Sequence, residues 1–284
     1  MVKIFITGAT GRLAHYAIDF LHEFAPDAEL FGMVRTDQQV SSLEERGVTA
    51  RKGDYADKDS LVRAFEGMDR LLFISVPQAD LQENVVTAAK EAGISYIAYT
   101  SINAIDYDKF GLEINHRATE ELIRQSTIAH TFLRNSWYLE INRANIKAAA
   151  KTGRFYYTGQ GKISHATRKE LAEAAARVIA TADFPEVVEL GRDAYTFADL
   201  GQAVQEALER EIEVKEVTAD EVAVLLKEVG ISEFEQDFSI AMMTYAVAGE
   251  NGEDQVTATD YERVTGHAFA RLSEAVKSIL EEDK

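Results

Sequence analysis

The sequence contains no cysteine and only three prolines in 284 residues. Without cysteine the chain can form no disulfide, no thiolate zinc site and no thiol nucleophile, so any redox chemistry must belong to a bound cofactor. Its six histidines form no H-x-x-x-H or H-E-x-x-H pair, and we predict no metal site. No run of about 18 apolar residues occurs, and the N-terminal MVKIFITG begins as a strand rather than as a signal sequence. These absences predict a globular, cytoplasmic protein.

Basic residues are also scarce. The chain has 30 lysines and arginines against 48 acidic residues, which gives a net charge of -18. Such a charge repels phosphate backbones and anionic lipids, so we expect neither a nucleic-acid nor a membrane partner. Hydrophobic residues make up 46% of the chain, enough for a substantial core. We expect a small-molecule partner and a monomer or homodimer.

The first 150 residues alternate short β-branched runs with helical stretches. KIFIT at 3–7, LAHYAIDFLHEF at 13–24 and ELFGMV at 29–34 are the first of these segments. This order predicts an α/β fold, a doubly wound parallel sheet of the Rossmann type with helices on both faces. Ligands of such sheets bind beyond the carboxyl ends of the strands. We expect residues 1–150, with later segments interleaved, to form this domain and 151–284 to form a smaller, mostly helical substrate or lid lobe.

A nucleotide-binding loop follows the first predicted strand. TGATGRLA places Gly8, Gly11 and Ala14 in G-x-x-G-x-x-A spacing, and a helix follows. The glycines permit a tight turn and close approach to a pyrophosphate, and the helix N-terminus supplies amide donors. An ordinary strand-to-helix turn is the alternative interpretation.

Two residues after later strands bear on the choice of cofactor. Arg35 stands where an acidic residue would bind the ribose 2'-hydroxyl of NAD, and a guanidinium there favours the 2'-phosphate of NADP. Asp37, two residues later, is the argument for NAD. Asp54, after the third predicted strand, either holds the adenine edge or caps the next helix.

Several motifs together resemble a known family. TGATGRLA, MVRT, GDYAD, LLFIS, IAYTS, HRATE, TFLRNSWY and GKISHATRKELAEAAARVI are similar to the NmrA-like branch of the atypical short-chain dehydrogenases, especially its quinone reductase and triphenylmethane reductase types. The resemblance extends over nearly the whole chain and implies NADP (NADPH) as cofactor. The implied cofactor contacts are Gly8, Ala9, Thr10, Gly11, Arg12, Leu13, Arg35, Ser75, Val76, Pro77, Ser136, Trp137, Tyr138, Leu139, Glu140 and Ile141. One departure is the loop VPQADLQ, which is shorter than we expect for those types and leaves the substrate less defined.

The proton relay of a tyrosine-dependent dehydrogenase is missing. Such an enzyme needs a lysine four residues after its tyrosine, on the same helical face, to lower the pKa of the phenol. Gly111 stands four residues after Tyr107, Lys109 only two, and none of the 11 tyrosines has a lysine at that distance. We interpret residues 107–111 as a loop. A quinone needs no such relay, because its ring is electron-poor and its oxygens can take protons from water.

The acceptor is expected to contact side chains near the ends of the fifth and sixth strands. The candidates are Tyr99, Ser101, His116, Asn135, Trp137 and Tyr138. Tyr99 and Trp137 are alternatively core aromatics, and His116 a helix-surface histidine. FSIAMMTYAV at 238–247 is either a lid over an apolar acceptor or a core helix, and the acidic pair at 120–121 is interpreted as a solvated helix face.

The sequence thus predicts an NADPH-dependent reductase that passes hydride directly to a quinone-like or conjugated aromatic acceptor. The alternative is a non-catalytic sensor that binds NADP(H) and regulates a partner, as some NmrA-like proteins are thought to do. A sensor would bind the cofactor without turnover.

Overall fold

The chain divides into two compact units in the computed structural model, which describes residues 1–76 and 78–282. Unit 1 comprises Met1–Asn135, Arg168–Leu190 and Thr259–His267. Unit 2 comprises Ser136–Thr167, Gly191–Ala258 and the chain from Ala268 onward. The chain leaves unit 1 directly after Asn135 and returns to it twice, so both units are built from separated segments. The assignment of a cofactor role to one part and a substrate role to the other stays a prediction.

Unit 1 is built on a seven-stranded sheet in the order β11-β6-β5-β4-β1-β2-β3, with every neighbouring pair parallel. This confirms the predicted doubly wound sheet. The strands are β1 (Lys3–Ile6), β2 (Glu29–Val34), β3 (Thr49–Lys52), β4 (Arg70–Phe73), β5 (Tyr96–Ile102), β6 (Ala129–Asn135) and β11 (Val187–Leu190). β5 is buried along its whole length, as expected for a strand covered on both faces.

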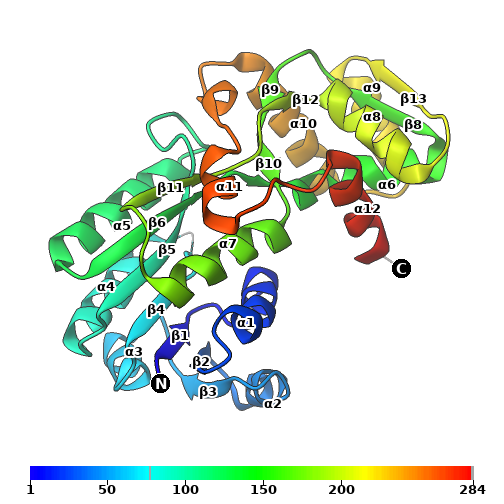
Figure 1. Cartoon of the computed structure of the whole chain (residues 1–284). Coiled ribbons are helices and arrows are strands. Elements are labelled where there is room, and N and C mark those ends of the chain that lie inside the picture. The colour runs from blue at the N-terminus through cyan, green and yellow to red at the C-terminus, as the bar shows by residue number, and fades with distance from the viewer. Residues whose placement is uncertain (77, 283–284) are drawn as a thin grey trace. The chain divides into compact units, whose positions relative to one another are not determined.

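Helices cover both faces of this sheet (Figure 1). They are α1 (Arg12–Phe24), η1 (Asp37–Gln39), α2 (Val40–Glu44), α3 (Lys58–Phe65), α4 (Ala79–Glu91), α5 (Leu112–Ser126), α7 (Arg168–Thr181) and α11 (Thr259–Thr265). α1 packs against α7, and α3, α4 and α5 pack side by side on the opposite face. Apolar side chains of α3, α4 and α5 form one core with side chains of the strands. The strand residues of this core include Phe5, Phe73 and Phe132. The layers therefore leave the carboxyl edge of the sheet to its loops.

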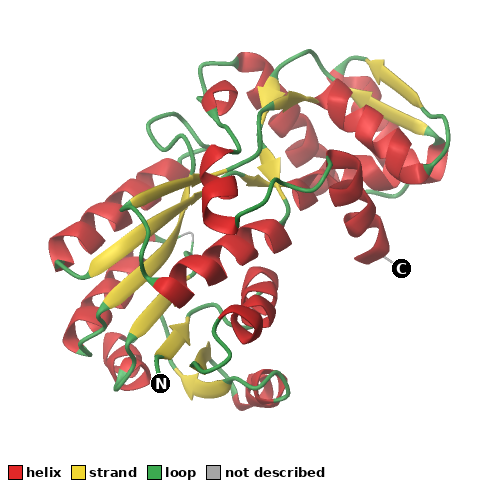
Figure 2. Ribbon diagram, in the orientation of Figure 1, coloured by secondary structure: helices red, strands yellow, loops and turns green. Residues whose placement is uncertain are grey.

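Unit 2 is mostly helical, and its strands form three two-stranded sheets (Figure 2). Its helices are η2 (Leu139–Asn142), α6 (Arg143–Thr152), α8 (Phe197–Leu208), α9 (Ala219–Glu228), α10 (Glu233–Ala248), η3 (Glu253–Gln255) and α12 (Leu272–Glu282). The sheets pair β7 (Trp137–Tyr138) with β10 (His165–Ala166), β9 (Lys162–Ile163) with β12 (Tyr195–Thr196), and β8 (Arg154–Tyr157) with β13 (Glu213–Glu216). Thr218 and Glu221 form a capping box at the start of α9, which stabilises its first turn.

Within the described ranges, no helix has both the length and the apolar character needed to cross a membrane.

Candidate functional site

The loop after β1 has the geometry of a phosphate cradle. Gly8 adopts a positive φ of 58°, which a residue with a side chain rarely takes. The Gly11 amide donates to the Gly8 carbonyl oxygen at 2.8 Å, and a Cβ on Gly11 would lie 3.1 Å from that oxygen. Gly11 is also the N-cap of α1 and makes no side-chain cap. The amides at the start of α1 therefore meet no capping side chain and can face an anion.

Close packing behind the loop holds it in place. Ala9 is fully buried, and a Cβ on Gly32 of β2 would come within 2.9 Å of the Ala9 Cβ. The Thr7 hydroxyl accepts from the Ile74 amide at 2.9 Å, which ties the end of β1 to that of β4. Of the predicted cofactor contacts in the loop, Ala9 can therefore offer only its backbone.

Tyr55 is a neighbour of this loop that the sequence analysis did not single out. Its hydroxyl lies 3.7 Å from the position of a Gly8 Cβ. The hydroxyl is buried and has no partner of hydrogen-bonding geometry among residues 1–76 and 78–282. Burial raises the pKa of Tyr55, and Thr7 and the Gly8 backbone offset this in part. The phenol is thus a protonated donor beside the loop, which fits a cofactor phosphate or ribose oxygen.

Two cations lie at neighbouring strand ends, Arg35 directly after β2 and Lys52 at the end of β3. Arg35 is exposed, and its backbone amide donates to Gln39 Oε1 at 2.9 Å within the capping box of η1. Lys52, the last residue of β3, forms a 2.7 Å ion pair with Asp37. The Asp37 carboxylate had favoured NAD over NADP. In the structure its negative charge is paired with Lys52. Lys52 is a further candidate for binding the 2'-phosphate, and it was not predicted from the sequence. The one sequence feature that pointed to it was its position at the end of the third predicted strand.

Asp54 was predicted either to contact the adenine or to cap the next helix, and the structure assigns the cap to Asp57. The Asp54 carboxylate accepts from the Ala56 amide at 2.9 Å in a local turn. The N-cap of α3 is Asp57, which accepts from the Ser60 amide at 3.1 Å. The interpretation of Asp54 as the cap was wrong, because the cap lies three residues later, at Asp57, and the helix begins at Lys58. Its contact with the cofactor stays a prediction.

The turn after β4 uses its backbone amides internally. The Ser75 amide donates to the Thr100 hydroxyl at 2.9 Å, and the Val76 amide to Gln82 Oε1 at 3.2 Å. Any cofactor contact by Ser75 or Val76 must therefore use other atoms. Pro77, the third predicted contact here, lies outside the described residues.

Tyr99 lies in the core of unit 1. Its side chain is fully buried and its ring contacts Phe73 and Phe132, with centroids 4.9 and 6.4 Å away. Its hydroxyl donates to Gln82 Oε1 at 3.1 Å and lies 2.9 Å from His116 Nδ1. Burial raises the pKa of Tyr99, so the phenol stays protonated. This placement favours the core alternative for Tyr99, with the hydroxyl acting on His116.

His116 is held on α5 by that hydroxyl, and most of its ring is covered. Burial lowers the pKa of His116 to about 4, against the raising effect of the Glu120 and Glu113 carboxylates. The imidazole is therefore neutral near pH 7. The alternative of a solvated surface histidine does not match this environment.

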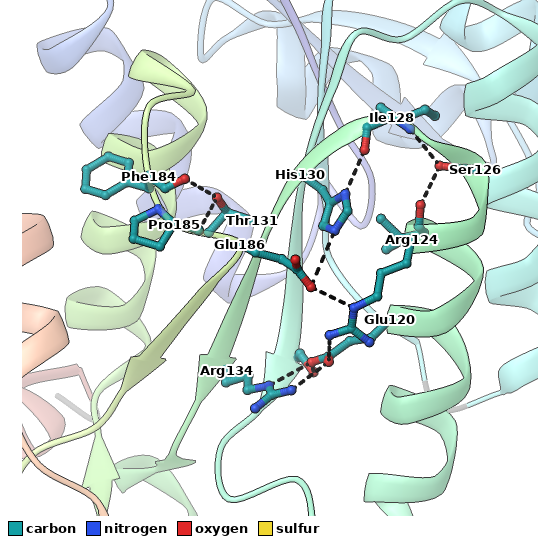
Figure 3. A network of polar contacts seen from close by, with 12 residues as sticks. Glu120, Arg124, Ser126, Ile128, His130, Thr131, Arg134, Phe184, Pro185 and Glu186 are labelled. Atoms are coloured by element: carbon teal, nitrogen blue, oxygen red, sulfur yellow. Dashed lines mark hydrogen bonds and ion pairs between the residues drawn. The ribbon is translucent and has the colours of Figure 1, made fainter.

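Glu120 and Arg134 belong to a buried network of charges (Figure 3), which Ser101 joins. The Ser101 hydroxyl donates to Glu120 Oε1 at 2.7 Å. The Glu120 side chain is only 2% exposed, and Arg134 of β6 donates to both of its oxygens, at 3.0 and 2.8 Å. Arg124 reaches the same carboxylate at 3.3 Å. The interpretation of Glu120 as a solvated residue was wrong, and the Ser101 hydroxyl is already engaged.

The outer part of the same network joins α5 and β6 to the chain entering β11. Arg124 Nε donates to Glu186 at 2.7 Å (Figure 3). Arg134 Nη1 donates to Glu189 at 3.0 Å. Burial raises the pKa of Glu189, and Arg134 partly offsets this. Buried charges need such partners to be tolerated. The network thus fixes the strand ends that carry Ser101 and Asn135.

Two buried asparagines follow β5 and end β6. The Asn103 amide nitrogen of the backbone donates to the Asn135 carbonyl at 3.0 Å. The side-chain Oδ1 of Asn135 and both side-chain polar atoms of Asn103 lack hydrogen-bond partners among the residues that the structure describes. Buried polar atoms of this kind are costly unless something else satisfies them. Asn103 was not among the predicted site residues, although its motif YTSIN was expected at the crevice.

The predicted contacts after β6 lie in unit 2. Ser136 is buried, and its hydroxyl has no hydrogen-bond partner in the described part of the chain. Leu139 is fully buried and Glu140 nearly so, whereas Trp137, Tyr138 and Ile141 are half-buried. Leu139 can therefore offer only its backbone to a ligand. The set as a whole stays a prediction.

No group of three or more histidine, aspartate or glutamate side chains in residues 1–76 and 78–282 is placed to hold a metal ion. The features that are present fit a dinucleotide: a helix start without a side-chain cap, a protonated phenol, one cation after β2 and one at the end of β3, and buried polar atoms without hydrogen-bond partners in the described residues.

Comparisons with known proteins agree with this geometry. A family model described as NAD(P)H-binding matches residues 8–182. Quinone oxidoreductase 2 of Escherichia coli (strain K12) is 35% identical over 284 residues, which cover 98% of each chain.

Two solved structures are similar over the whole fold. Triphenylmethane reductase of Citrobacter sp. complexed with NADP(H) has 31% identity and a TM-score of 0.85, covering 97% of this chain and 99% of that one. NADPH-dependent quinone oxidoreductase from Escherichia coli complexed with NADPH has 34% identity and a TM-score of 0.83, covering 98% and 99%. The resemblance inferred from the motifs is confirmed, and the chain belongs to the NAD(P)H-binding family.

Proposed function

We propose that the protein is an NADPH-dependent reductase that passes hydride directly to a quinone-like or other conjugated aromatic acceptor, without flavin or metal. The observation that carries this proposal is the full-length similarity to reductases whose structures hold NADP(H). The loop after β1 supports it, since its backbone fits a pyrophosphate.

The reaction balances with one proton from water. NADPH supplies a hydride, which carries two electrons, so a quinone, NADPH and a proton give a hydroquinone and NADP+. The task left to the chain is to align the two rings and to stabilise the negative charge that develops on the acceptor oxygen.

His116 is the side chain that we assign to the water molecule that supplies this proton. Its Nδ1 is bound to the Tyr99 hydroxyl, and its Nε2 makes no hydrogen bond within residues 1–76 and 78–282. The Tyr99 hydroxyl has one proton and donates it to Gln82 Oε1, so it accepts from His116 Nδ1–H, and Nε2 is left as an acceptor that can orient a water molecule. The Nε2 lone pair is available at pH 7, because burial lowers the pKa of the imidazole to about 4 and keeps it neutral.

Preference for NADPH over NADH is assigned to Arg35 and Lys52. Both are cations on adjoining strand ends, and a phosphate dianion gains charge-assisted hydrogen bonds that a hydroxyl does not. Arg35→Ala should weaken NADPH binding by about 10-fold or more, the value of one charged hydrogen bond, and leave NADH binding nearly unchanged. Fluorescence titration with both nucleotides checks this, and an equal loss for both would refute the assignment of the 2'-phosphate.

Turnover decides between a reductase and the sensor alternative. We expect the purified protein, with no flavin added, to oxidise NADPH in the presence of 1,4-benzoquinone or a triphenylmethane dye, measured by the loss of absorbance of NADPH. Tight binding of NADPH with no oxidation by any quinone or dye would contradict the reductase and support the sensor.

A further inference from the structure

Gln82 of α4 is a buried amide that joins the turn after β4 to Tyr99. The residue has no exposed surface. Its Oε1 accepts from the Val76 amide at 3.2 Å and from the Tyr99 hydroxyl at 3.1 Å. Its Nε2 donates to the Thr119 hydroxyl at 2.7 Å. Both polar atoms of the side chain are therefore satisfied, as a buried amide requires.

Two backbone groups fix which end of this amide faces Tyr99. The Thr119 hydroxyl donates its one proton to the Asn115 carbonyl oxygen at 2.9 Å, so toward Gln82 it can only accept. The Val76 amide can only donate, so it requires an oxygen at the other end of the Gln82 side chain. A rotated amide would turn its NH2 group against the Val76 N–H. Gln82 therefore turns Oε1 toward the Tyr99 hydroxyl.

The Tyr99 hydroxyl passes this direction on to His116. Its proton lies on the side of Gln82 Oε1, so its oxygen accepts from His116 Nδ1 at 2.9 Å. In the opposite direction the oxygens of Tyr99 and Gln82, which are 3.1 Å apart, would face each other with no proton between them. The loss of one buried hydrogen bond in that arrangement favours the Nδ1–H tautomer of His116 about tenfold.

The tautomer decides what His116 offers to a ligand, since the ring is neutral near pH 7. With the proton on Nδ1, Nε2 carries a lone pair and no hydrogen. A group that meets Nε2 must then be a hydrogen-bond donor.

We propose that Gln82 is a positioning residue that holds His116 in the Nδ1–H tautomer, so that Nε2 selects hydrogen-bond donors, namely a water molecule or the hydroxyl of a bound ligand. The role in turnover rests on the proposed function, whereas the tautomer depends on unit 1 alone. Val76 belongs to the turn that is predicted to contact the cofactor, and Gln82 and Tyr99 join that turn to His116.

The test reads the tautomer by NMR. Protein labelled with 15N in its histidines is measured at pH 7 by long-range proton–nitrogen correlation, and the His116 signals are identified by their absence in His116→Gln. Protonated and bare ring nitrogens have well-separated 15N shifts. We expect the proton on Nδ1 and a bare Nε2. A proton on Nε2 in the parent protein would overturn the inference.

Three variants at two glutamines test the role of Gln82. Gln82→Met removes the amide at similar volume and frees the Tyr99 hydroxyl to donate to Nδ1, so the ring proton should move to Nε2. Gln82→Glu should keep the parent tautomer, because burial keeps the new carboxyl protonated and it then offers Tyr99 the same acceptor. Gln125→Met is the matched control, since Gln125 is exposed on α5 and donates to Glu121. A proton that stays on Nδ1 in Gln82→Met would show that Gln82 does not set the tautomer.

A double variant tests the route through Tyr99. Tyr99→Phe removes the hydroxyl through which Gln82 acts, so adding Gln82→Met to it should not change the His116 shifts further. An additional change would contradict this route.

Kinetics separate the tautomer from the proposed function. With 1,4-benzoquinone, kcat should fall about tenfold or more in Gln82→Met, because the proton carrier is misdirected, and Gln82→Glu and Gln125→Met should stay close to the parent. A moved proton with an unchanged kcat would refute the role of the tautomer in turnover. The NMR measurement needs neither NADPH nor an acceptor, so absence of turnover in the parent would contradict the proposed function while the shifts still decide the tautomer.

Discussion

Removing Arg134 should destabilise unit 1 strongly, because it leaves a buried carboxylate without its main partner. In Arg134→Met, Glu120 keeps only the Ser101 hydroxyl at 2.7 Å and Arg124 at 3.3 Å. The Glu120 side chain is 2% exposed, so water cannot replace the two lost hydrogen bonds. Breaking a buried ion pair by removing one partner costs about 3–5 kcal/mol.

The expected signal is a lower melting temperature. A loss of about 3–5 kcal/mol corresponds to a drop of roughly 6–20 °C in a chain of this size, at about 2–4 °C per kcal/mol. Circular dichroism at 222 nm measures it. Hydrogen exchange of the β5 and β6 amides shows whether the loss lies in unit 1, because the two units need not unfold together.

Two further variants test the reasoning. Glu120→Gln combined with Arg134→Met removes both charges and should lose less stability than Arg134→Met alone. Arg263→Met breaks the more exposed Arg263–Asp260 pair, which is 3.0 Å long, and should cost at most about 1 kcal/mol. If Arg134→Met costs no more than Arg263→Met, the carboxylate of Glu120 does not depend on its partner and the argument from burial fails.

Three other predictions concern protonation, packing and capping. The folded-state pKa of His116, about 4, lies below its unfolded value of 6.5, so this residue should reduce stability as the pH falls from 6.5 to 4; urea unfolding of His116→Gln should show a smaller loss over that range, and an identical slope would contradict the assignment. Gly161→Ala should unfold part of unit 2 or lower its expression, because a Cβ there would overlap the Ala246 backbone, and a melt within 2 °C of the parent would contradict this. Asp57→Ala should lower the free energy of unfolding by about 1 kcal/mol through loss of the α3 cap, measured by urea denaturation, and Asp54→Ala is the comparison that should cost less.

Much of the framework could be predicted from local patterns. The glycine spacing of the first loop, the β-α alternation and the Thr218–Glu221 capping box depend on residues a few positions apart, and the structure has all three. The spacing of Tyr107 and Lys109 predicted that residues 107–111 form a loop, and the structure confirms this. Backbone conformation and hydrophobic periodicity are local properties, so one sequence suffices to infer them.

The burial and the protonation of the polar side chains could not be predicted in the same way. Glu120 is one of two adjacent glutamates on a helix, and only its contacts with Ser101 of β5 and Arg134 of β6 explain its burial. His116 is neutral because burial lowers its pKa to about 4, and only the fold brings its Nδ1 to the Tyr99 hydroxyl.

The sequence by itself determined the family, the nucleotide loop and the sheet that presents it. The tertiary structure alone decided which charged groups are buried, that Lys52 pairs with Asp37, and that α10 packs into the core of unit 2 through Met242 and Met243. The physical reason is that burial and pairing are set by residues distant in the chain, whereas strands, turns and helix caps are set by their neighbours.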